Sequence, residues 1–177
     1  YRDETIEMTQ FAAEKGVAAV VLVVPACLPS IQSNPEETII DYFTQIHEQT
    51  NIPIILYNPQ TIPEAFRITP TMVEQLSKLE RMIGIKLSTT DIYWLTSLID
   101  AAGDENFHLI AGSERIYYQA IASGACGVIG QGCSIYPEIL RKIWDTFIEG
   151  DLNTERLCQR DVNQDLEGFP NLDQDHS

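Results

Sequence analysis

The strongest constraint on the fold of this chain is a regular alternation of apolar, β-branched runs with segments of helical period. The first apolar run, 18–24, is apolar on both faces, which is typical of a strand covered on both sides in a parallel sheet or barrel. Further strands are predicted at 52–57, 82–87, 107–111 and 126–129, and helices at 4–15, 36–49, 69–78, 92–102, 115–123 and 137–149. This pattern predicts about five consecutive βα units of an α/β protein.

Repeated βα units fit either a doubly wound sheet or a (β/α)8 barrel. The spacing of the strands favours the barrel, and eight units at this spacing need about 250 residues. Because the chain has 177 residues, we expect an incomplete TIM (β/α)8 barrel whose N-terminal strands are missing. We assign 1–150 to the partial barrel, 151–167 to a C-terminal helical segment, and 168–177 to a disordered acidic tail.

Charge excludes several classes of partner. With 26 acidic and 11 basic residues the net charge is −15, which repels nucleic acids and anionic membrane surfaces. The chain has neither an apolar run of about 20 residues nor a basic, apolar leader. We therefore expect a cytoplasmic protein without nucleic-acid or membrane partners.

The cysteines and histidines do not form a metal-binding pattern. The four cysteines lack a C-x-x-C pair, and the three histidines lie far apart without paired spacing, so we predict reduced thiols and no metal. The run 130–132 lacks the third glycine of a dinucleotide fingerprint, and no P-loop occurs. We therefore predict no cofactor.

Lys86 is the unusual residue of the predicted strands, since it is a long cation within the apolar run 83–87. Burial of an unpaired ammonium favours the neutral amine, which is the form that attacks carbonyl carbon. We therefore interpret Lys86 as an imine-forming nucleophile. The alternative is a lysine at a strand end whose ammonium reaches solvent.

Tyr57 ends the strand that precedes the Lys86 strand. In a barrel, the carboxyl ends of the strands form the catalytic face, and a phenol beside an imine-forming amine can move protons. The alternative is an aromatic residue at the edge of the core, with its hydroxyl in water.

Several blocks of sequence resemble the dihydrodipicolinate synthase and N-acetylneuraminate lyase family of class I aldolases. The two most specific are the run 55–58, which contains Tyr57, and the run 84–86, which contains Lys86. The resemblance extends to about Gly150 and corresponds to the C-terminal two-thirds of the family. The supporting blocks are Val23-Val-Pro25, Asp91-Ile-Tyr93, Ala111-Gly-Ser-Glu114 and Gly124-Ala-Cys-Gly-Val-Ile-Gly130.

The resemblance implies a lyase or aldolase in which Lys86 forms a Schiff base with pyruvate or a related 2-oxo acid while Tyr57 relays protons. It also implies a homo-oligomer, a tetramer in this family, without cofactor or metal. Two of the residues matching the pocket have a structural alternative to substrate contact. Ser88 is then a loop hydroxyl, and Glu114 is a solvated or helix-capping carboxylate. The residues that match the family's substrate pocket are Ser88, Gly112, Glu114 and the backbone of Ile129.

The chain also departs from the family pattern. Ala26 and Cys27 occupy the place of a tyrosine pair in the synthases, and no arginine follows Tyr57 within 58–63. These departures disfavour true dihydrodipicolinate synthase activity. The run 86–93 resembles the N-acetylneuraminate lyases, whereas Arg115 and Gln131 replace residues expected in them, so an N-acetylneuraminate lyase and a sugar-acid aldolase or dehydratase both stay open. The family's loop for the 2-oxo acid carboxylate would precede Tyr1, so a truncated, catalytically inactive barrel fragment is the alternative function.

Overall fold

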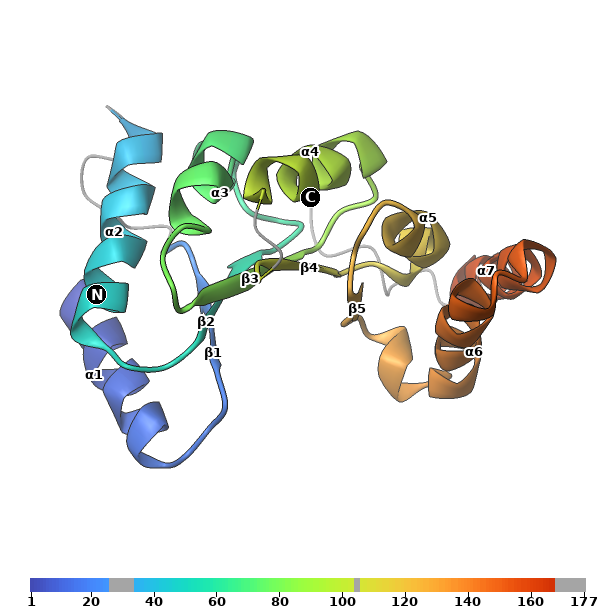
Figure 1. Ribbon diagram of the computed structural model, residues 1–177, viewed down its shortest axis with the longest axis horizontal. Coiled ribbons are helices and arrows are strands. Elements are labelled where there is room, and N and C mark those ends of the chain that lie inside the picture. The colour runs from blue at the N-terminus through green and yellow to red at the C-terminus, as the bar shows by residue number, and fades with distance from the viewer. Residues whose placement is uncertain (26–33, 104–105, 168–177) are drawn as a thin grey trace. The chain divides into compact units, whose positions relative to one another are not determined.

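The computed structural model describes residues 1–25, 34–103 and 106–167 (Figure 1). Its strands form a five-stranded sheet in the order β1-β2-β3-β4-β5, which is also their order along the chain. β1 runs parallel to β2, and β4 runs parallel to β5. The predicted α/β alternation is confirmed. The strands are β1 Val20–Val23, β2 Ile54–Asn58, β3 Met82–Leu87, β4 His108–Ala111 and β5 Gly127–Val128.

The helices follow the predicted segments closely. They are α1 Arg2–Glu14, α2 Pro35–Gln49, α3 Pro70–Leu76, α4 Ile92–Ala102, α5 Tyr117–Ala122, α6 Pro137–Glu149 and α7 Leu152–Glu167. Two short 3-10 helices were not predicted, η1 Glu64–Phe66 and η3 Gly132–Ser134. A third, η2 Glu114–Ile116, precedes α5 and overlaps the start of the predicted helix 115–123. Each lies in the connection that follows a strand, which is where the functional residues of βα folds lie.

β5 is shorter than the predicted strand 126–129. The flanking residues nevertheless continue the pairing with β4, because Cys126 N donates to Leu109 O at 2.8 Å and Ile129 N donates to Ala111 O at 2.9 Å. The predicted run is thus bonded along its length, although only its two central residues have the regular ladder geometry.

The chain divides into two compact units, the first comprising residues 1–86 and 100–108 and the second residues 87–99 and the chain from 109 onward. The boundaries assigned from composition at 150 and 167 stay a prediction. The tail 168–177, predicted to be disordered, lies outside the described residues.

In the first unit, α2 contributes one apolar stripe to the core, with Ile39, Phe43 and Ile46 fully buried. Thr69 begins α3 by accepting a hydrogen bond from Met72 N through its hydroxyl. The same hydroxyl donates to the Glu36 carboxylate at 2.6 Å, which ties α3 to the neighbouring α2 (Figure 1).

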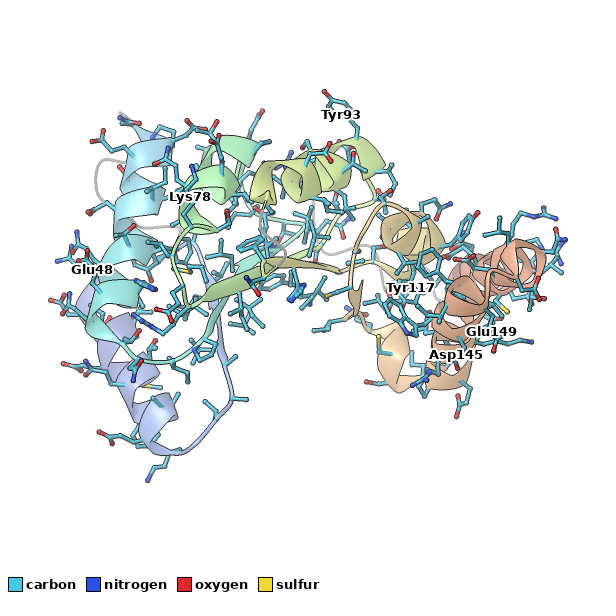
Figure 2. All side chains as sticks on the ribbon, in the orientation of Figure 1. Glu48, Lys78, Tyr93, Tyr117, Asp145 and Glu149 are labelled. Atoms are coloured by element: carbon cyan, nitrogen blue, oxygen red, sulfur yellow. The ribbon has the colours of Figure 1, made fainter. Side chains whose placement is uncertain are left out.

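In the second unit, α5, α6 and α7 enclose a core of their own (Figure 1). α6 ends at Gly150, whose φ of 76° is left-handed and allows the chain to turn directly into α7. Tyr117 of α5 points into this core (Figure 2). The buried members of this core are Tyr117, Ile121, Leu140, Ile143, Cys158, Val162 and Leu166.

Among the helices of the described ranges, none is long and apolar enough to cross a lipid bilayer.

Candidate active site

Tyr57 and Lys86 lie together in the first unit, at the carboxyl ends of β2 and β3. A hydrogen bond of 2.7 Å from Ile54 N to Arg81 O connects the beginnings of these strands, so Tyr57 and Lys86 follow on neighbouring strands. Lys86 Nζ lies over the Tyr57 ring, 4.6 Å from the ring centroid. The structure therefore brings together the two residues predicted to be catalytic.

Lys86 is half-buried, and not fully buried as its apolar neighbours suggested. β3 is not buried evenly along its length: its buried residues include Gly84, Ile85 and Leu87. The side chains of Ile83 and Lys86 are partly exposed. The aromatic face of Tyr57 offers the ammonium a cation–π contact, worth about 0.5–2 kcal/mol.

Val23 adds a third strand to this site. It is the register partner of Tyr57 on the adjacent strand β1, and its side chain is 43% exposed. Val23 belongs to a block that supports the family resemblance, but the sequence did not predict a place for it at the site, because a valine in an apolar run has no chemical signature. Strand register is the property that places it beside the tyrosine.

Asn58 holds the loop that follows Tyr57. Its side chain is 1% exposed, and its Oδ1 accepts a hydrogen bond of 2.9 Å from Ile68 N. Its Nδ2 donates to Pro59 O at 3.2 Å. Asn58 thereby fixes both ends of the segment 59–68 at the carboxyl end of β2, a role that the sequence analysis missed.

Ser88 and Gly112 lie together in the second unit. Gly112 N donates a hydrogen bond of 2.8 Å to Leu87 O. A Cβ atom at position 112 would lie 2.7 Å from Ser88 Cα and 2.9 Å from Leu87 O, so only glycine fits without a shift of the backbone. The glycine of this block is therefore explained by the close approach of two chain segments.

Glu114 is buried, at 6% exposure, so its carboxylate is not solvated, and it does not cap its own helix η2. Its Oε1 accepts a hydrogen bond of 2.5 Å from Gly132 N. A Cβ atom at position 130 would collide with the Glu114 carboxylate. Glu114 thus packs against the backbone of 130–132, whereas a contact with substrate stays a prediction.

Ile129 and Tyr136 flank this glycine segment. The Ile129 side chain is 50% exposed, while its backbone N–H is used in pairing with β4. The Tyr136 hydroxyl packs against Gly132 and has no hydrogen-bond partner among the described residues. Burial, and secondarily the Glu114 carboxylate, raises the pKa of Tyr136 to about 12, so the hydroxyl keeps its proton at neutral pH.

The block 91–93 has a structural role. Asp91 accepts a hydrogen bond of 3.0 Å from Trp94 N, which caps the start of α4. Tyr93 is 84% exposed and projects from the start of α4 into solvent (Figure 2). Ala26 and Cys27, where the chain departs from the synthase pattern, lie outside the described residues.

Metal ligands are not clustered in the part of the chain that the structure describes. Within 1–25, 34–103 and 106–167, no three His, Cys, Asp or Glu side chains are grouped so that they could hold an ion. Cys126, Cys133 and Cys158 are free thiols.

Comparison with known sequences gives a match along almost the whole chain. Residues 2–168 match the dihydrodipicolinate synthetase family. A 4-hydroxy-tetrahydrodipicolinate synthase of Methanothrix thermoacetophila is 26% identical over 152 residues, which are 84% of this chain and 49% of the relative. A synthase of the same name from Geobacter sulfurreducens is 29% identical over 155 residues, 86% of this chain and 51% of the relative. The chain thus spans about half the length of the curated relatives it matches.

Solved structures show the same fold. The prophage protein YagE of E. coli, a member of the dihydrodipicolinic acid synthase family solved in complex with pyruvate, superposes with a TM-score of 0.83 at 22% identity. The match covers 96% of this chain and 56% of YagE. Dihydrodipicolinate synthase from Bacillus anthracis gives a TM-score of 0.80 at 24% identity, covering 90% of this chain and 53% of that protein. The five-stranded sheet is therefore an incomplete (β/α)8 barrel, as predicted.

The order of the βα units, the fold of the solved neighbours and the match over residues 2–168 agree with one another. This chain belongs to the dihydrodipicolinate synthetase family.

Proposed function

We propose that the protein is a lyase that forms a Schiff base between Lys86 and a 2-oxo acid such as pyruvate. The observation that carries this proposal is the position of Lys86 Nζ 4.6 Å from the ring centroid of Tyr57, at the ends of neighbouring strands. The pyruvate bound to YagE supports the choice of substrate class.

In the proposed reaction, the neutral amine of Lys86 attacks the ketone carbon of the 2-oxo acid. The carbonyl oxygen leaves as water when the carbinolamine collapses to the imine, and Tyr57 supplies and recovers the protons. In cleavage, the protonated imine accepts the electron pair of the broken carbon–carbon bond and becomes an enamine. In bond formation, the imine first loses a proton from the adjacent carbon, and the resulting enamine supplies the electron pair of the new bond. This chemistry needs no metal and no organic cofactor.

From the family resemblance we also propose four substrate contacts among residues of the second unit: Ser88, Gly112, Glu114 and the Ile129 backbone. The departures at Ala26, Cys27 and 58–63 argue against true dihydrodipicolinate synthase activity, and the run 86–93 supports a partner substrate of the sialic-acid or sugar-acid kind. We further propose a cytoplasmic location, from the charge and hydropathy of the chain, and a homo-oligomer, as the family resemblance implies.

The test is reduction of the imine. The protein is incubated with pyruvate and borohydride, and its intact mass is compared with that of Lys86→Arg treated in the same way. One reduced pyruvyl group on the unsubstituted protein, absent from Lys86→Arg, is the expected result. Equal labelling of the two would show that another amine reacts.

The alternative, a catalytically inactive barrel fragment, predicts an unchanged mass for this chain. The same trapping on a longer protein containing this sequence then separates the two cases. Labelling of only the longer protein identifies the chain as an inactive part of an active lyase, whereas absence of labelling from both overturns the proposed chemistry.

A further inference from the structure

A buried glutamine of α7 is hydrogen-bonded to the segment that carries Glu114. Gln159 is 4% exposed. Its Nε2 donates to Glu114 O at 2.8 Å and to Arg115 O at 3.3 Å, and its Oε1 accepts from Tyr118 N at 2.7 Å. One side chain thus holds both the beginning of η2 and the first turn of α5.

A further hydrogen bond helps to fix the orientation of the Gln159 amide. Gln159 Nε2 also donates to Asn163 Oδ1, one turn later on α7, at 3.1 Å. Donors face three oxygens and the acceptor faces a backbone N–H, so rotation of the amide by half a turn would break the whole set. A glutamine at this position therefore has a specific function beyond filling space.

Glu114 connects the segment held by Gln159 to the backbone of 130–132. While Gln159 holds its carbonyl group, its side-chain Oε1 accepts the hydrogen bond of 2.5 Å from Gly132 N. The carboxylate also lies against Gly130. Displacement of η2 would therefore displace the hydrogen-bond acceptor on which 130–132 depends.

We infer that Gln159 is a positioning residue that acts through Glu114 on the backbone at 129–132. The meaning of this role for catalysis rests on the proposed function, in which Glu114 and Ile129 contact the substrate. Gln159 itself does not enter the reaction. Its loss should weaken the binding of the 2-oxo acid while leaving the imine chemistry of Lys86 unchanged.

The direct test is amide hydrogen exchange under native conditions in the unsubstituted protein, Gln159→Leu and Gln164→Leu. Gln164 is an exposed glutamine of the same helix and provides the matched control. In Gln159→Leu we expect the amides of Gly132 and Tyr118 to exchange about tenfold faster, the effect of about one lost hydrogen bond. The Val162 amide should keep its protection. Unchanged exchange at Gly132, or equal acceleration at Val162, would overturn the inference.

Gln159→Glu decides the question if Gln159→Leu does not fold. This variant keeps an acceptor for Tyr118 N but loses the donors to Glu114 O and Arg115 O. Faster exchange at Gly132 with unchanged exchange at Tyr118 is the expected result. Unchanged exchange at both amides contradicts the role of Gln159.

A functional measurement separates this inference from the proposed function. Borohydride trapping is titrated with pyruvate, and we expect Gln159→Leu to raise the half-saturating concentration several-fold without lowering the labelled fraction at saturation. An unchanged half-saturating concentration, or a lower labelled fraction at saturation, would contradict the claim that Gln159 supports binding of the 2-oxo acid. If the unsubstituted protein is not labelled, the proposed function fails, while the exchange experiment still decides the positioning role.

Discussion

The ammonium of Lys86 lies over the aromatic ring of Tyr57, with Nζ 4.6 Å from the ring centroid. The contact joins the ends of two neighbouring strands and lies on a half-buried surface. A small substrate bonded to Nζ would therefore remain within reach of the tyrosine. This geometry allows the ring and the hydroxyl of Tyr57 to be tested separately.

Tyr57→Phe keeps the ring over the ammonium and removes only the hydroxyl. Because general acid–base groups contribute about 10²- to 10⁴-fold to rate, we expect imine trapping to slow by a factor in this range without loss of stability. The measurement is the initial rate of borohydride labelling with pyruvate. Tyr93→Phe, at a tyrosine that is 84% exposed, is the control. Equal rates in Tyr57→Phe and the unsubstituted protein would exclude proton relay by this hydroxyl.

Gly84→Ala should destabilise the strand that carries Lys86. A Cβ atom at this position would collide with the backbone carbonyl oxygen of His108, and such overpacking costs about 1–3 kcal/mol. Gly127→Ala is the matched control, because a Cβ atom there meets nothing within 4 Å. Denaturant unfolding should show a clear loss for Gly84→Ala and a change below about 0.5 kcal/mol for Gly127→Ala. Equal stabilities of the two variants would contradict the close packing of β3.

Glu155→Gln should stabilise the protein at neutral pH. Glu155 is fully buried, and neither carboxylate oxygen has a hydrogen-bond partner in the described ranges. Burial raises the pKa of its carboxyl group. The contribution of Glu155 to stability is therefore most favourable below the unfolded-state pKa of about 4.3 and becomes less favourable as pH rises through the folded-state pKa.

We expect Glu155→Gln to unfold about 2–4 °C higher than the unsubstituted protein at pH 7, the shift that corresponds to about 1 kcal/mol. The difference should vanish near pH 4. Glu149→Gln replaces an exposed carboxylate at the end of α6 and serves as the control (Figure 2). A lower melting temperature of Glu155→Gln at pH 7 would indicate that the carboxylate has a stabilising partner.

His47→Gln should reduce the loss of stability that the unsubstituted protein shows in weak acid. Burial, and secondarily the neighbouring Arg81 guanidinium, lowers the pKa of His47. Both ring nitrogens are buried without a hydrogen-bond partner among the described residues. Because the unfolded chain binds this proton more readily, the contribution of His47 to stability becomes less favourable as pH decreases through the unfolded-state value of about 6.5.

Unfolding in urea between about pH 7.5 and 5.5 measures this effect, since this range brackets the ordinary histidine pKa. The unsubstituted protein should lose stability across the range, and His47→Gln should lose less. His108→Gln, at an exposed histidine, should behave like the unsubstituted protein. Parallel pH profiles for all three proteins would rule out His47 as the source.

The sequence predicted the strands and helices well, because apolar periodicity directly reflects which faces are buried. It also identified Tyr57 and Lys86, which lie on strands whose ends are neighbours in a parallel sheet. It did not predict the 3-10 helices η1 and η3, since these depend on contacts between segments. Asn58 and Gln159 were missed for the same reason: an amide in a loop or on a polar helix has no distinctive pattern until its partners are known.

The collision expected at position 130 links two distant positions of the sequence. Any side chain there would occupy the space of the Glu114 carboxylate, whereas a shorter residue at 114 would vacate that space and leave Gly132 N without its acceptor. A side chain at 130 would therefore push the end of the Glu114 side chain away from Gly132 N. Across the family, we expect larger residues at the position of Gly130 to coincide with shorter ones at the position of Glu114, so that their covariation is an evolutionary trace of this packing.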